Sequence, residues 1–496
     1  MGVLMRYTLR ALLAVSMLLG VYVLALGIVG ALLLGVYEIV VHGLTGAFVV
    51  KLFVLAALVA VAVGRGLWAG LRRPGGDDTG VLLVEPDQPR LWSQVRHLAE
   101  QVGTRPPDEI RLIHDVNAAV SEDSRWLGLV SGTRRMYVGA PLLTGLTALQ
   151  MRSVLAHELG HYGGRHTGLA GVTYRGQESL RGMIGHLGSS SLIGRILRLY
   201  ARAYVAVASS VNRRQELEAD ECSARLAGKG VAIRALQELP AIDAGWAWFL
   251  EDYATDAAGG GRRPRELFAG FLHFWTSPEQ QQRLDPLRTD PPVEQRSVYD
   301  SHPSTPERVA FLARLDTPDV PDDSGPALDL LDDAPAALRR LEEWMFEGSA
   351  LTEVPWEEFA STSLAARTHV NAATLISAME LGGETKGDLG QALEAMRLGW
   401  TIDLVAPLMR EDATEEHRRL AAGGLVGDLV ADALIANGLA CYRLSWSEGR
   451  PLVGHDGAVL DPWVLAQAAA QSPEKVPDLA EWCQEHSVPL THRPTR

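Results

Sequence analysis

The distribution of apolar positions predicts two membrane-spanning helices at the N-terminus. Residues 11–37 contain no charged side chain, and residues 45–68 contain only Lys51 and Arg65, one near each end. About 20 apolar residues cross the hydrocarbon core of a bilayer, so both stretches are long enough to span it. Residues 1–73 are therefore expected to form a transmembrane helical hairpin, with a buried helical hairpin of a soluble protein as the alternative.

The flanking cations predict how this hairpin is oriented. Two arginines precede the first predicted span, and three lie at or beyond the end of the second: Arg6, Arg10, Arg65, Arg72 and Arg73. The connection between the spans contains no arginine. Because cytoplasmic flanks carry the excess of Lys and Arg, both ends are expected in the cytoplasm. The chain is then a multi-pass protein of the cell membrane whose remaining domains are cytoplasmic.

Residues 148–163 have apolar side chains at helical spacing and contain the sequence His157-Glu158-Leu159-Gly160-His161. Histidines four residues apart lie on the same helix face, so both imidazoles can bind one zinc ion. Glu158 is then positioned to deprotonate a zinc-bound water. The alternative is a solvated polar helix face. The apolar residues before the motif, and Gly163-Gly164 after it, favour the metal site.

A catalytic zinc site needs a third protein ligand, for which residues 212–228 offer candidates. This stretch is prone to form a helix and is rich in acidic residues. Glu216 and Asp220 lie four residues apart on one face, whereas Glu218 points elsewhere. A ligand, Glu216, with a carboxylate that orients a ligand histidine, Asp220, would suit this pair. Taken alone, the stretch is more typical of a solvated acidic helix than of a ligand helix.

Composition narrows the function classes. The chain has 496 residues, with 46 Lys and Arg against 60 Asp and Glu, a formal net charge of −14. This acidic balance, without a basic block, argues against a nucleic-acid partner. The three cysteines are far apart and form no CxxC pair, which argues against thiolate zinc sites and suits a reducing compartment. Histidine and carboxylate remain as the available zinc ligands.

The C-terminal third carries no recognisable catalytic motif. Residues 316–333 contain seven Asp and no Lys or Arg, which predicts a solvated acidic linker. Beyond it, residues 334–496 are expected to form an α-rich cytoplasmic accessory domain of unknown role. Helices are expected at residues 335–345, 388–400 and 415–440, and a strand at 441–446.

Further motifs accompany the histidine pair in a fixed order. They are Asn117-Ala118, a strand at Arg135–Val138, Arg213 or Arg214 before Glu216 and Asp220, and His302-Pro303 followed by Arg308. Over about residues 80–315 the chain resembles the HtpX-like and CAAX-prenyl-protease-1 family of membrane-bound zinc metallopeptidases. Read without this resemblance, Asn117 is equally a turn residue, and His302 a loop residue before a helix capped by Ser304.

The resemblance implies a fold and a set of site residues. Residues 80–315 would form a zincin-like (gluzincin) domain, mainly α-helical, with a small antiparallel sheet whose edge pairs with an extended substrate. One zinc ion per chain would be bound by His157, His161 and Glu216. Glu158 would be the general base, and Asn117 and His302 would hold the substrate backbone or the developing oxyanion.

These features together predict a membrane-anchored zinc endopeptidase that acts on membrane or misfolded proteins. Its expected partners are protein or peptide substrates and the lipid bilayer. The alternative is a membrane scaffold that has a structural zinc site and no proteolytic activity. Glu158 favours the enzyme, because a structural zinc site needs no general base.

Overall fold

The computed structural model describes residues 79–123, 132–163, 192–255, 261–290, 303–382, 387–410, 412–447 and 449–495, with scattered positions between 16 and 61. The predicted membrane hairpin, residues 11–37 and 45–68, therefore lies largely outside the described residues. Within the described part of the chain, no helix combines the length and the apolar character needed to cross a membrane.

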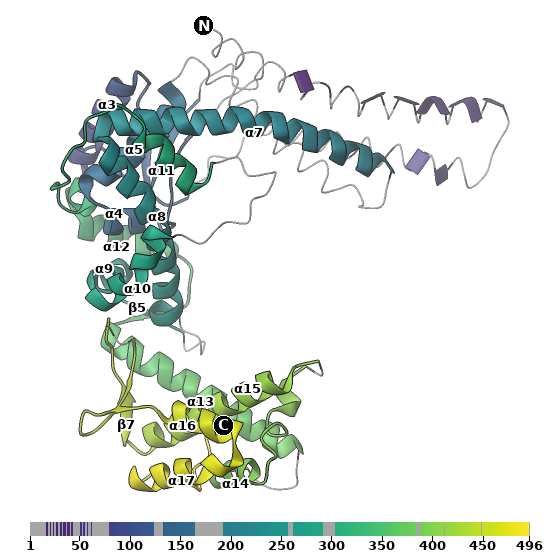
Figure 1. Cartoon of the computed structure of the whole chain (residues 1–496), viewed down its shortest axis with the longest axis vertical. Coiled ribbons are helices and arrows are strands. Elements are labelled where there is room, and N and C mark those ends of the chain that lie inside the picture. Colours follow the sequence, from purple (N-terminus) through teal and green to yellow (C-terminus); the bar gives the residue numbers. More distant parts are fainter. Residues whose placement is uncertain are drawn as a thin grey trace. The chain divides into compact units, whose positions relative to one another are not determined.

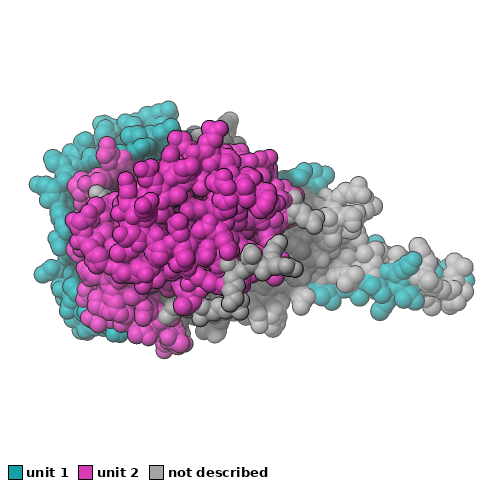
Figure 2. Space-filling model, turned by 90° about the horizontal axis from the view of Figure 1, so that it is seen from below, with its two compact units in different colours: residues 1–243, 284–345 teal, residues 244–283, 346–496 magenta. Residues whose placement is uncertain are grey.

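The chain divides into two compact units, each built from two segments (Figure 2). The first comprises Met1–Asp243 and Leu284–Met345, and the second comprises Ala244–Arg283 and Phe346–Arg496. The divisions fall inside helices α8 (Lys229–Phe249) and α10 (Pro278–Thr289). They differ from the predicted boundaries, because residues 244–283 belong to the second unit and residues 334–345 to the first.

A four-stranded sheet of order β1-β2-β4-β3 lies in the first unit. Its strands are β1 (Val81–Leu82), β2 (Glu109–Ile113), β3 (Ala118–Glu122) and β4 (Arg134–Gly139). The sheet is mixed, so the predicted antiparallel sheet is wrong in one pair. After β3 the chain reverses and β4 inserts between β3 and β2, which makes it antiparallel to β3 and parallel to β2. Strand β4 confirms the predicted strand, and β3 forms an edge.

Helices make up most of the first unit (Figure 1). They are α3 (Pro89–Val102), α4 (Ala140–Gly145), α5 (Ala148–Gly163), α7 (Leu192–Ala227), α11 (Thr305–Ala313) and α12 (Ala334–Met345), with a 3₁₀ turn η3 (Ala327–Leu330). Helix α7 is continuous over 36 residues. Its C-terminal part lies beside α5 and α11.

The acidic segment 316–333 is packed onto the first unit and does not behave as a free linker. Asp322 accepts a hydrogen bond from the Thr147 hydroxyl (2.6 Å), and the Ser324 hydroxyl accepts one from the Leu149 backbone at the start of α5 (2.9 Å). Asp332 accepts one from the Arg90 backbone at the start of α3 (2.9 Å). Helix N-termini present unpaired N–H groups and a partial positive charge, so acidic side chains are favoured beside them.

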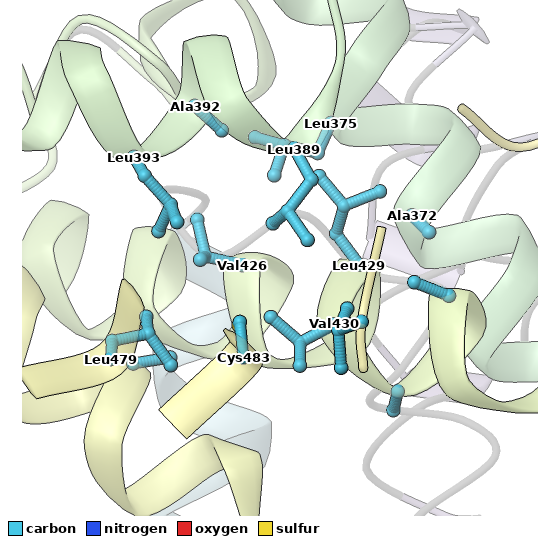
Figure 3. Packing of buried hydrophobic residues seen from close by; sticks show 14 of the residues in the cluster. Ala372, Leu375, Leu389, Ala392, Leu393, Val426, Leu429, Val430, Leu479 and Cys483 are labelled. Atoms are coloured by element: carbon cyan, nitrogen blue, oxygen red, sulfur yellow. The ribbon is translucent and has the colours of Figure 1, made fainter. Parts of the chain in front are cut away.

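The second unit is also mainly helical. Its helices are α9 (Leu267–Thr276), α13 (Trp356–Gly382), α14 (Leu389–Arg397), α15 (Glu415–Ala436), α16 (Pro462–Gln471) and α17 (Val476–Glu485), with the 3₁₀ turns η4 (Ala406–Leu408) and η5 (Pro473–Lys475). Leu375, Leu393, Leu429 and Leu479 belong to a buried apolar core between four of these helices (Figure 3). The C-terminal part is α-rich, as predicted, and α14 and α15 correspond to the helices expected at residues 388–400 and 415–440. Helices α13, α16 and α17 were not predicted.

Short strands and one distorted helical turn complete the second unit. Strands β5 (Arg262–Pro264) and β6 (Thr352–Val354) pair in parallel, and β7 (Ala440–Tyr442), β8 (Leu452–Gly454) and β9 (Val459–Leu460) form an antiparallel meander. Helix α8 ends in a π-helical turn, η2 (Leu250–Ala254). The protein is therefore mainly helical with small sheets, as predicted.

Candidate metal centre

Helices α5 and α7 meet along two complementary faces. On α7, Glu216, Asp220 and Ser223 fall on one face at helical spacing, and Ser153, His157 and His161 do the same on α5. The Ser153 and Ser223 hydroxyls are buried and 2.6 Å apart, while His161 lies beside Glu216 at the other end of the contact. The helices thus run antiparallel, with both histidines held against the acidic face.

Gly160 allows the close approach of these helices. A Cβ atom at this position would lie 3.2 Å from the Ala219 Cα and 3.3 Å from the Cys222 Cβ, tighter than ordinary van der Waals contact. Leu159, the other variable residue of the motif, is fully buried. The motif residues between the histidines therefore set the helix packing that brings Glu216 to them.

Three side chains converge on one point between the helices. One donor atom each from His157, His161 and Glu216 lies within 4.8 Å of the others. The His157 Nε2 is 3.5 Å from one Glu216 carboxylate oxygen, and the His161 Nε2 is 3.7 Å from the other. Glu216 is only 6% exposed. In the described part of the chain, this is the group of His, Cys, Asp and Glu residues compact enough to hold a metal ion.

The separations fit a metal ion better than direct hydrogen bonds. Hydrogen bonds from nitrogen to oxygen are about 2.7–3.2 Å long, shorter than both contacts. Ligand atoms about 2.0–2.1 Å from a tetrahedral zinc ion are about 3.4 Å apart, close to both contacts. Two imidazoles and one carboxylate are also the protein ligands of many hydrolytic zinc sites. The residues therefore suit zinc, with a fourth position left for water or substrate.

Asp220 and Arg308 hold His157 on the side of its ring that faces away from the metal position. The Asp220 carboxylate lies 3.0 Å from the His157 Nδ1, which leaves Nε2 directed to the metal position. The Arg308 guanidinium donates to both Asp220 oxygens, at 2.9 and 2.6 Å. Asp220 is 2% exposed, so its charge is stabilised by these partners and not by water.

Helix α11 positions Arg308 through its packing. Leu312, one turn beyond Arg308, is fully buried against Ala224 of α7 and Ala232 of α8. Ser304 and Glu307 form a reciprocal capping box at the start of α11, as the sequence predicted. The carboxylate partner of Arg308 was not predicted, because the pair joins residues 88 positions apart. In the sequence, the motif His302-Pro303 singled out Arg308 but did not indicate what its side chain contacts.

Opposing effects set the charge of His157. Burial is the largest and lowers its pKa, but the carboxylates of Asp220 and Glu216 raise it, and the pKa is about 9 against an ordinary value of 6.5. The pKa of Asp220 lies below its usual range: burial raises it, but Arg308 and His157 outweigh burial. The carboxylates around His157 thus favour a bound proton, or a metal cation in its place.

The zinc-free protein is expected to lose stability as the pH rises. A folded-state pKa above the unfolded value means that protonated His157 contributes stability below pH 6.5, and that this contribution is lost as the pH rises through about 9. The contribution is on the order of 3 kcal/mol. Thermal unfolding of chelator-treated protein across this range measures the loss. His157→Gln should show a shallower pH dependence, and an equally steep decline in this variant would contradict the assignment.

Asp220→Asn is expected to weaken zinc binding about 10- to 100-fold, as losses of carboxylates behind ligand histidines typically do. The amide keeps the volume but no longer fixes the His157 tautomer, and it leaves the Arg308 charge without its carboxylate. Competition with a calibrated zinc chelator measures the affinity. Glu218→Gln is the matched control, because Glu218 is on the same helix but half exposed and paired with Arg214. Equal affinities in the two variants would show that Asp220 does not support the ligand.

The other predicted site residues are placed as follows. Glu158 lies on α5 next to His157, and its charge raises the pKa of both His157 and Arg308. Asn117 is exposed and directly precedes the edge strand β3, with its backbone N–H bonded to the Asp115 carbonyl (2.9 Å). His302 lies outside the described residues.

Hydrogen bonds and a cation–π contact connect the C-terminal end of α5 to the edge strand β3 and its neighbours. The Tyr162 hydroxyl donates to the Val120 carbonyl of β3 (2.7 Å), and the Arg134 guanidinium lies over the Tyr162 ring at 4.5 Å. The Thr104 hydroxyl donates to the Tyr162 carbonyl (3.1 Å). These contacts hold β3 next to α5, so an extended chain paired with this strand would pass near the metal position.

Comparison with known proteins agrees with this site. Residues 85–316 match the family model described as peptidase family M48, and this segment contains the three metal-binding candidates with Glu158, Asp220 and Arg308. No curated protein and no solved structure matches the chain. The predicted resemblance to the HtpX-like and CAAX-prenyl-protease-like metallopeptidases is confirmed by this match of residues 85–316 to peptidase family M48.

Proposed function

We propose that the protein is a membrane-anchored zinc endopeptidase that hydrolyses peptide bonds of membrane or misfolded proteins at the cytoplasmic face. The observation that carries this proposal is the convergence of His157, His161 and Glu216 on one metal-sized position, beside Glu158. A gluzincin fold for residues 80–315 is part of the proposal. A zinc ion bound there supplies Lewis-acid activation of the scissile carbonyl and of water.

The protein's own residues supply binding and proton transfer. Backbone groups of β3 pair with an extended substrate, and Asn117 at the start of that strand holds its backbone. Glu158 accepts the proton of the attacking water and later delivers it to the leaving amine. His302 donates a hydrogen bond to the developing oxyanion. Asp220 and Arg308 keep His157 oriented through these steps.

Membrane anchoring is proposed from the N-terminal sequence. The charge-free stretch 11–37 and the stretch 45–68 are long enough to span a bilayer. Helical residues described in this region expose large apolar side chains, among them Val23 (70%) and Phe53 (57%), which supports burial in lipid. The arginines flanking the hairpin favour a cytoplasmic location for the peptidase domain.

The proposal is tested with the full chain solubilised in detergent and a denatured protein such as casein as substrate. We expect cleavage that stops on addition of a chelator and returns when zinc is restored. Detergent should extract the protein from cell membranes, whereas alkaline carbonate should leave it in the membrane fraction. A folded, zinc-loaded sample that cleaves no denatured protein would instead indicate a scaffold with a structural zinc site.

A further inference from the structure

The second unit contains a cavity of about 430 Å³ lined by three arginines, Arg283, Arg367 and Arg450. Binding sites for small molecules are typically about 300–1,000 Å³ in volume. The cavity lies between the π-helical turn η2, the start of α10, helix α13 and the loop between β7 and β8. π-Helical turns are rare and occur frequently at functional sites.

Arg450 is a partly buried cation that forms no ion pair with the described residues. Its Nη1 contacts only neutral oxygens, the Tyr253 carbonyl at 3.3 Å and the Ser363 hydroxyl at 3.4 Å. Within the described residues, no carboxylate lies at ion-pair distance from Arg450 or Arg367. Burial and the charge of Arg367 together lower the pKa of Arg450 to about 10. A buried guanidinium in this situation is stabilised by an added anion.

The acidic residues at the cavity have other partners. Asp252 lies 3.7 Å from Arg283, whose guanidinium also covers the Trp248 ring at 4.0 Å. Glu279 accepts a hydrogen bond from the Ser277 hydroxyl (2.7 Å). Asp252 also interacts electrostatically with Arg450, and Asp428 with Arg367, but among the described residues neither carboxylate forms an ion pair with these arginines, so both charges remain available to a ligand.

The backbone around Arg450 is held in place before any ligand binds. The Gln280 amide donates to the Trp446 carbonyl (3.0 Å), and the Tyr253 hydroxyl lies within hydrogen-bond distance of the Ser445 carbonyl (3.1 Å). Arg367 is one turn from Ser363 on α13, and the Ser363 hydroxyl lies 3.4 Å from the Arg450 Nη1, so both arginines belong to elements that are held in place. Elements that are held in place before binding reduce the entropy that is lost when an anion binds between them.

We propose that this cavity binds the oxyanion of a small ligand, a carboxylate or a phosphate, between Arg367 and Arg450. The planar guanidinium matches both groups, because its parallel N–H donors form paired hydrogen bonds with two oxygens. The site is separate from the metal centre and does not depend on the proposed peptidase function.

Isothermal titration of the full chain in detergent tests this site, with inorganic phosphate in one arm and N-acetylglycine in the other, at constant ionic strength set with chloride. We expect saturable binding of one anion per chain, and the tighter of the two identifies the ligand class. Arg367→Gln and Arg450→Gln should each weaken binding about tenfold or more. Arg367 is exposed, so its variant keeps the fold. Arg397→Gln, at an exposed ion pair on α14, is the control and should bind normally.

Two outcomes would overturn the proposal. The first is that neither anion binds saturably, or that binding is unchanged in both cavity variants while thermal unfolding shows them folded. The second concerns Glu448, which precedes Arg450 by two residues and lies outside the described residues. Binding that appears only after Glu448→Gln would mean that a carboxylate of the chain itself occupies the site.

Discussion

Glu158→Gln is expected to abolish peptide cleavage while the protein retains one zinc ion per chain. Glutamine keeps the size of the side chain but cannot accept the proton of the attacking water. General-base catalysis contributes about 100- to 10,000-fold to the rate of a reaction, so the cleavage rate should fall by that factor. Glu158 is not among the three residues that converge on the metal position, so zinc binding should be preserved. Cleavage of a fluorogenic peptide and metal analysis of the same sample measure both quantities.

The matched control for this variant is Glu218→Gln, which makes the same chemical change at an exposed position. It should cleave at the wild-type rate. Cleavage by zinc-loaded Glu158→Gln at a comparable rate would exclude Glu158 as the base. Loss of zinc together with activity would indicate that Glu158 acts in metal binding or folding.

The histidine pair could be predicted from sequence because the information is local. A four-residue spacing on a helix fixes the relative direction of His157 and His161, whatever surrounds them. Leu159 and Gly160 occupy the two positions of the H-E-x-x-H motif at which the residue type is not specified. The structure shows that they determine helix packing, with Leu159 buried and Gly160 at the closest approach to Ala219.

The sequence narrowed the candidates for the third metal ligand but did not identify which residue it is. Helical spacing separated Glu216 and Asp220 from Glu218, but an isolated acidic helix does not show which face meets another helix. Only the packing of α7 on α5 places Glu216 near both imidazoles and Asp220 behind one of them. The family resemblance supplied this assignment before the structure did.

Long-range contacts account for what the sequence did not predict. Composition marked residues 316–333 as a solvated linker, yet Asp322 and Asp332 are bound at the starts of α5 and α3. The pairing of β2 with β4 likewise depends on the insertion of β4 beside β2, which no strand pattern encodes. The sequence pattern therefore predicted individual helices and strands better than it predicted which of them pack against each other.

Glu216→Ala is expected to abolish stoichiometric zinc binding and with it all peptidase activity. The variant removes the only ligand that α7 contributes, so the loss of affinity should exceed the about 10- to 100-fold cost of losing a supporting carboxylate. Two histidines on α5 would remain, and they do not complete a catalytic zinc site. Zinc content after gel filtration, and activity with zinc added back, measure the effect.

Glu218→Ala separates this role from the general acidity of the helix. Both substitutions remove one negative charge from the same stretch of α7, but Glu218 is half exposed and paired with Arg214, whereas Glu216 is buried against the histidines. Glu218→Ala should bind zinc and cleave substrate normally. Equal zinc loss in both variants would mean that the charge of the helix, and not a ligand at position 216, holds the metal. Full zinc binding by a folded Glu216→Ala protein would exclude the three-residue site altogether.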